Sequence, residues 1–116
     1  MTRDFHLKDI LSVMTGILIG SKISDLYDIL AFISDDNNLY THQLPRVARE
    51  CRPYLLKEMP WLVEIDASSV NKENVSKWLK CQVQKYGEYH KVSQMPVGCH
   101  KKIDPIDDFY TLFGGD

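Results

Sequence analysis

One segment near the middle of the chain constrains the fold most, because residues 41–51 have the pattern of an amphipathic helix at its start. Thr41 is a suitable N-cap, and Pro45 falls in the first turn, where a missing backbone N–H costs little. At about 100° per residue, one face collects the apolar side chains of Leu44, Val47, Ala48, Cys51 and Leu55. We therefore expect a helix that begins at Thr41 and packs this face on the core. Pro53 should either kink the helix or end it near Arg52.

The opposite face of this segment carries cationic side chains. His42, Arg46 and Arg49 fall within roughly 60° of one another around the helix axis. A guanidinium fork and an imidazole can converge on a carboxylate or a phosphate, which makes these three residues candidate binding residues. Glu50 and Glu58 could instead neutralise the arginines within the same segment. The sequence leaves open whether this face binds a partner or is an ordinary solvated surface.

Two helices are expected before this segment. Residues 7–19 form one broad apolar stripe, with Gly20 as the expected end; its members are Leu7, Ile10, Leu11, Met14 and Leu18, with Ile17 beside them. Gly16 lies inside this pattern and indicates a close approach of another helix. The apolar spacing of residues 24–34 predicts a second helix, which should pack on the first because the connection is short.

The rest of the chain continues the helical pattern. Asn71 should cap a helix over residues 72–86 that ends at Gly87, and Trp61 and Leu62 should plug the core before it. Residues 88–95 alternate weakly, as in a short strand or an extended arm. Asp104 and Pro105 indicate the start of a short terminal helix. The sequence thus predicts a mainly α fold, a compact single-domain helical bundle of four to five helices over residues 1–116, with room for one short β hairpin or extended arm.

Composition limits the classes of function. The 116 residues include no stretch of about 20 apolar residues and no clear signal peptide, so we expect no membrane contact and a cytoplasmic location. The net charge of −2 does not favour nucleic-acid binding, although a local basic patch remains possible. Cys51, Cys81 and Cys99 lack Cys-x-x-Cys spacing, which argues against disulfides or a zinc ribbon, and Cys51 should be an inert buried thiol.

The strongest catalytic hypothesis combines distant residues. His42 and His100 with Arg46 and Asp104 would supply a base, a second imidazole, an anion clamp and an orienting carboxylate for hydrolysis. Asp104, however, already has a sufficient role as a helix cap.

No metal or cofactor is expected. Asp35 and Asp36 lie in a turn-forming run that lacks the Gly and distal Glu of a calcium loop, so they stay candidate binding residues only. His90, Cys99 and His100 have poor spacing for a metal. Glycine-rich phosphate loops and nucleophile-elbow motifs are absent from the sequence.

Several short motifs are shared with known proteins. Residues 9–16, residues 27–30, the Thr-His-Gln-Leu-Pro-Arg core of residues 41–46, and His100 followed by residues 103–106 resemble a family of small uncharacterised proteins encoded by tailed bacteriophages and prophages. The resemblance implies a viral origin but no reaction. The connection after the first helix, Gly20 to Ile23, is shorter here than in other members.

Three functions remain open. The first is a non-enzymatic inhibitor that binds a host protein or ribonucleoprotein complex of a bacterial defence system, as anti-CRISPR proteins do. The second is a small hydrolase using His42 and His100. The third is a phage accessory or regulatory protein that contacts nucleic acid through Arg46, Arg49 and the lysines of residues 72–86.

Overall fold

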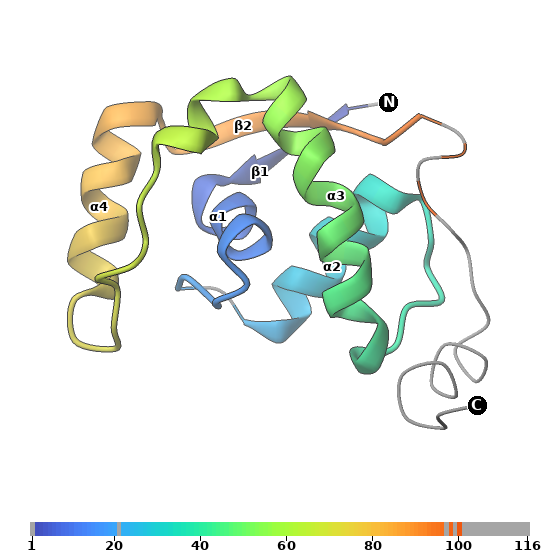
Figure 1. The fold of residues 1–116 in the computed structure, drawn as a ribbon, viewed down its shortest axis with the longest axis horizontal. Coiled ribbons are helices and arrows are strands. Elements are labelled where there is room, and N and C mark those ends of the chain that lie inside the picture. The colour runs from blue at the N-terminus through green and yellow to red at the C-terminus, as the bar shows by residue number, and fades with distance from the viewer. Residues whose placement is uncertain (1, 21, 97, 99, 101–116) are drawn as a thin grey trace.

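Four α-helices and one two-stranded sheet make up the part of the chain that the computed structural model describes, which is residues 2–20, 22–96, 98 and 100 (Figure 1). The elements in chain order are β1 (Thr2–His6), α1 (Leu7–Thr15), α2 (Ile23–Ser34), the 3-10 turn η1 (Thr41–Gln43), α3 (Leu44–Glu58), the 3-10 turn η2 (Pro60–Glu64), α4 (Val75–Tyr86) and β2 (Tyr89–Ser93). The prediction of a mainly α fold with one short β pair is confirmed. No helix in these described ranges is long and apolar enough to cross a bilayer.

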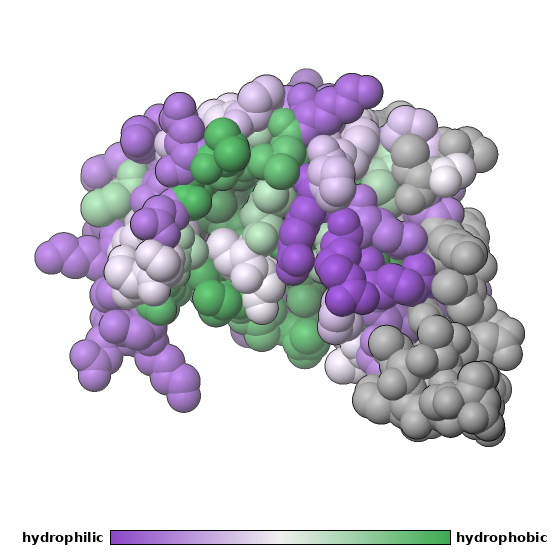
Figure 2. Space-filling model, in the orientation of Figure 1, coloured by the Kyte–Doolittle hydropathy of each residue, from purple (hydrophilic) through white to green (hydrophobic). Residues whose placement is uncertain are grey.

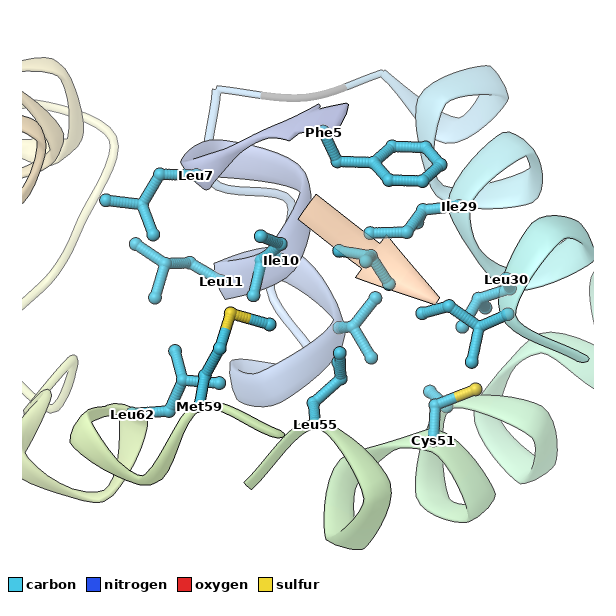
Figure 3. Packing of buried hydrophobic residues seen from close by; sticks show 14 of the residues in the cluster. Phe5, Leu7, Ile10, Leu11, Ile29, Leu30, Cys51, Leu55, Met59 and Leu62 are labelled. Carbon is cyan, nitrogen blue, oxygen red and sulfur yellow. The ribbon is translucent and has the colours of Figure 1, made fainter. Parts of the chain in front are cut away.

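The core lies where α1, α2 and α3 meet. Figure 3 shows Ile10 of α1 facing the side chains of α2 and α3, with Phe5 of β1 above Ile29, whereas Leu7 and Leu11 leave α1 on the side away from α2. The largest side chains without solvent exposure include Leu7, Ile10, Leu11, Ile29, Leu30 and Leu55. The apolar face predicted for α3 is buried as expected, because Leu44, Val47, Ala48, Cys51 and Leu55 all belong to this core.

The two strands come from opposite ends of the described chain. β1 and β2 pair antiparallel, with Thr2 opposite Ser93 and His6 opposite Tyr89. At one end of the pair, the Leu7 N–H donates to the Glu88 carbonyl at 2.8 Å. Beyond β2, the Met95 N–H donates to the Ile33 carbonyl of α2 at 2.8 Å and so ties the strand to that helix. The strand in residues 88–95 was predicted, but its partner β1 was not.

Helix α1 ends earlier than expected. Gly16 adopts φ 75°, a left-handed conformation that favours glycine, and its N–H donates to the Ser12 carbonyl at 3.1 Å. The predicted end at Gly20 is therefore wrong, and Ile17 and Leu18 do not belong to the buried stripe. The close neighbour of Gly16 is a side chain and not a helix backbone, since a Cβ there would lie 3.3 Å from Nη2 of Arg52.

The start of α3 differs from the prediction in one detail. A 3-10 turn precedes the helix, and Thr41 does not cap it; its hydroxyl instead hydrogen-bonds the Tyr27 hydroxyl of α2. Gln43 closes the turn by accepting the Tyr40 N–H at 2.9 Å. Pro45 lies in the first turn as predicted. The helix continues through Pro53 to Glu58, so of the two outcomes expected at Pro53, a kink or an end near Arg52, the end is wrong.

Helix α4 lies at the edge of the molecule. It begins three residues later than predicted, because Asn71 accepts the backbone N–H groups of Glu73 and Asn74 at 2.8 and 2.9 Å and forms a turn before the helix. Its end at Gly87 is confirmed. No residue of α4 is fully buried, and Trp61 stacks on Tyr86 with 4.6 Å between ring centroids. Leu62 enters the core as expected, and Trp61 is partly buried against the core while it stacks on Tyr86 of α4.

Candidate functional site

The structure divides the cationic face of α3 into residues in different environments. Arg46 is half-buried and its Nη1 lies 3.2 Å from Oε2 of Glu50, with 17% and 19% of the two side chains exposed. The intramolecular partner left open by the sequence is therefore Glu50. Arg49 is exposed, and the half-buried His42 meets the edge of the Tyr40 ring with 6.1 Å between centroids. These three side chains do not form one evenly exposed stripe.

His100 joins this face to the turn after α2. Its Nδ1 lies 2.6 Å from Oε1 of Glu50 and its Nε2 lies 3.0 Å from Oδ2 of Asp36, and only 5% of its side chain is exposed. A doubly protonated imidazole donates to both carboxylates, whereas a neutral ring can donate to only one. Asp36 also accepts the Asn38 N–H at 3.0 Å. We refer to Asp36, Arg46, Glu50 and His100 as the polar cluster.

The polar cluster connects segments of the chain and does not present a free base. Both ring nitrogens of His100 face carboxylates, and the pocket of about 440 Å³ beside it is lined by Asp35 and residues 94–96 but not by His42. Asp104, the proposed orienting carboxylate, lies outside the described residues. The structure thus brings the predicted residues Asp36, Arg46 and His100 together, leaves Asp35 exposed at the end of α2, and does not place His42 in that pocket.

Two other candidate reactive side chains, Cys51 and His90, are packed against neighbouring residues. Cys51 is buried, and burial, with a smaller effect of the Glu50 charge, raises the pKa of its thiol to about 12. The expectation that Cys51 is buried is confirmed, and a raised pKa is what a thiol of low reactivity requires. His90 packs on Trp61 with 4.9 Å between ring centroids, and Cys99 lies outside the described residues.

A different site lies between the end of α1, the start of α2 and the start of α3. A groove of about 390 Å³ is lined mostly by apolar side chains; the lining residues are Ser12, Gly16, Ile17, Leu18, Ile23, Leu26, Thr41, Leu44, Pro45, Ala48 and Arg52. We call it the apolar groove. Figure 2 shows hydrophobic surface between α4 and α3, with hydrophilic surface over α3 to its right. Ile17, Leu18 and Ile23 remain 47%, 43% and 47% exposed.

The exposed side chains of the groove stand on a fixed backbone. The Ile17 N–H donates to the Thr15 hydroxyl at 3.2 Å, and the Ile19 N–H donates to the Ser12 hydroxyl at 2.9 Å. Ile19 itself has no solvent exposure. Ile17 and Leu18 therefore project from a short connection that is held at both ends, and a partner would not have to order it.

Sequence reasoning missed this groove because it assigned Ile17 and Leu18 to the core stripe. A signal was present: a glycine after two hydroxyl residues at positions 12 and 15 is compatible with a helix C-terminus whose hydroxyls accept from the departing backbone. With that end placed at Gly16, the next two apolar residues leave the helical frame. Their exposure then becomes the expected result.

Comparison with known proteins places the chain in a family. A family model described as a domain of unknown function (DUF7736) matches residues 5–65, which is more than half of the chain. The chain belongs to this family. The matched region contains every lining residue of the apolar groove, whereas α4, β2 and His100 lie beyond it. No curated protein and no solved structure matches the chain.

Proposed function

We propose that this protein is a phage- or prophage-encoded inhibitor that binds a macromolecular complex of its bacterial host, in the manner of anti-CRISPR inhibitors of defence systems. It would act in the host cytoplasm on a protein or ribonucleoprotein target. The viral origin rests on the family resemblance of the sequence. The contact is proposed to be the apolar groove, and the observation that carries it is the exposure of Ile17, Leu18 and Ile23 around that groove.

Physical chemistry favours a binding role for this surface. Single exposed apolar residues are common, but adjacent large ones beside a concave apolar surface are typical of interaction sites. The backbone around Ile17 and Leu18 is fixed by the Ser12 and Thr15 hydroxyls, so binding there would cost little conformational entropy. Leucine and isoleucine side chains at 40–50% exposure retain apolar area that a partner can remove from water, at about 25 cal/mol per Å².

The experiment is affinity capture of the tagged full chain from host cells, followed by mass spectrometry. Wild type should retain a host assembly, and Leu18→Asp should reduce its recovery at least about tenfold, because a charged side chain in place of an apolar one would oppose docking. Val63→Asp is the matched control, since Val63 is 75% exposed and does not line the groove. Equal recovery with both variants, or no host assembly with wild type, would overturn the proposal.

A second candidate, contact with nucleic acid, is favoured by the charge of α4. Lys77, Lys80 and Lys85 are exposed, and the helix contains no acidic residue between Val75 and Tyr86. Binding of this kind should fall steeply as salt rises, because it depends on the release of counterions from phosphates. Retention on DNA or RNA at low salt that is lost with Lys77→Gln and Lys80→Gln would support it, and absence of retention would remove it.

A further inference from the structure

Arg52 places unused hydrogen-bond donors at the apolar groove. Its Nε donates to the carbonyl oxygen of Val13 at 2.8 Å, which fixes the guanidinium at the C-terminal end of α1. Among the described residues, its Nη1 and Nη2 groups make no hydrogen bond or ion pair. Nη2 lies next to Gly16, another residue that lines the groove. The Nε side of the guanidinium is thus anchored, and its Nη groups remain to donate to a ligand in the groove.

The other residues that line the groove supply no negative charge to pair with Arg52. Arg52 is the one charged residue among the described side chains that line the groove. Its neighbours there include Ile17, Leu18 and Leu44, and the only other polar side chains, Ser12 and Thr41, already bond to the Lys8 carbonyl and to Tyr27. A partner that covered this groove with apolar groups alone would take a guanidinium out of water without a counter-charge, which costs several kcal/mol.

From this geometry we infer that the apolar groove recognises a carboxylate carried by an apolar segment of the partner protein, with Arg52 as the residue that binds the carboxylate. The inference rests on the proposed function and names the chemistry of its partner. A carboxylate neutralises the guanidinium and accepts from it in a planar geometry, while the flanking apolar side chains fill the surface around Ile17 and Leu18. A nucleic-acid backbone fits poorly, because its repeated charges would meet a single cation among apolar walls.

A pair of small probes tests the chemistry without a known partner. The ¹⁵N-labelled full chain is titrated with sodium octanoate and, in parallel, with octan-1-ol, which has the same chain length but no charge. We expect octanoate to shift the amide signals of Gly16, Leu18 and Ile23 and the Nε–H signal of Arg52. It should bind about fivefold more tightly than the alcohol, as expected for one charge-assisted contact.

Variants assign that preference to Arg52. In Arg52→Gln the acid and the alcohol should bind equally well, whereas Arg49→Gln should retain the preference, because Arg49 is on the same helix but does not line the groove. Arg52→Lys keeps the charge without the planar fork and should give an intermediate preference. Equal binding of octanoate and octan-1-ol to the wild type would overturn the inference. A preference for octanoate that survives Arg52→Gln would also overturn it.

The same variants separate this inference from the proposed function. Host capture that depends on Leu18 but is unchanged in Arg52→Gln would leave the proposed function standing and overturn the assignment of a carboxylate. Carboxylate-selective binding of octanoate with no captured host assembly would overturn the proposed function, and with it the assignment of the carboxylate to a protein.

Discussion

Two arginines of α3, six residues apart, have opposite roles in the structure. Arg46 pairs with Glu50, four residues ahead, and belongs to the polar cluster that also holds His100 and Asp36. Arg52 is anchored by one backbone carbonyl of α1 and directs the rest of its fork toward the apolar groove. The two side chains have the same chemistry and share a helix. What distinguishes them is whether the described part of the chain also supplies a carboxylate: it does so for Arg46 and not for Arg52.

The largest effect on the free energy of unfolding is expected when the polar cluster loses Glu50. Glu50→Ala would leave Arg46 and the nearly buried His100 without their shared carboxylate, and should lower the free energy of unfolding by about 2–3 kcal/mol. Arg49→Ala, on the exposed face, should change it by less than about 0.5 kcal/mol. Urea unfolding followed by circular dichroism measures both. A Glu50→Ala cost as small as that of Arg49→Ala would mean that the cluster is not closed.

A smaller effect on the free energy of unfolding is expected at Gly16, which lies beside Arg52 at the apolar groove. Gly16→Ala forces an L side chain into a left-handed conformation and brings its Cβ to 3.3 Å from Nη2 of Arg52, so it should cost about 1–2 kcal/mol of stability. In an Arg52→Gln background the cost should fall by about 0.5 kcal/mol, because the contact is gone. Gly20→Ala is the control, since Gly20 also has positive φ but lies near Leu79. If the changes in the free energy of unfolding caused by Gly16→Ala and Arg52→Gln simply add, the Arg52 guanidinium does not contact residue 16.

Cys51 tests the buried face of α3 at a position that does not line the groove. Burial raises its pKa from 9.0 to about 12, so the thiol stays protonated in the folded state while it ionises in the unfolded state above pH 9. The stability that depends on the neutral thiol is complete below pH 9 and is lost as the pH rises toward 12. Between pH 8 and pH 10, the wild type should lose about 1 kcal/mol more than Cys51→Ala.

The measurement is urea unfolding at both pH values, in which only the pH-dependent difference is compared, since Cys51→Ala also leaves a cavity. Cys81→Ala is the control, because Cys81 is exposed and should keep the wild-type pH dependence. Wild type and Cys51→Ala with the same pH dependence would show that the thiol is not buried as described.

Sequence periodicity was sufficient for the helices and insufficient for what joins them. The apolar spacing of α3 determines which face is buried, because helical contacts are local, and that buried face was predicted. The β1–β2 pairing was not, since Thr2 meets Ser93 across nearly the whole described chain and a five-residue strand carries little pattern. The helix-ending role of Gly16 was missed because the apolar spacing continues past it, through Ile17 and Leu18.

The same limit applies to the candidate site. The sequence identified Arg46 as a cation on the polar face of α3 and Glu50 as one of two residues that could neutralise it. It could not indicate that His100, fifty residues later, also binds Glu50. Arg52 drew attention only as a position near the expected helix end. Its importance comes from the Val13 carbonyl, a backbone group of another helix, and no side-chain pattern reports where such a group lies.

The smallest effect on stability is expected at Ile17 and Leu18, and that small size is what the docking hypothesis needs. Replacing both with serine should change the free energy of unfolding by less than about 0.5 kcal/mol, as for other exposed positions. The connection is held by the Ser12 and Thr15 hydroxyls and by buried Ile19, not by these side chains. A loss above about 1 kcal/mol would mean that the two residues stabilise the fold itself. Their exposure would then no longer argue for a partner, and Arg52 would lie beside part of the core and not beside a docking surface.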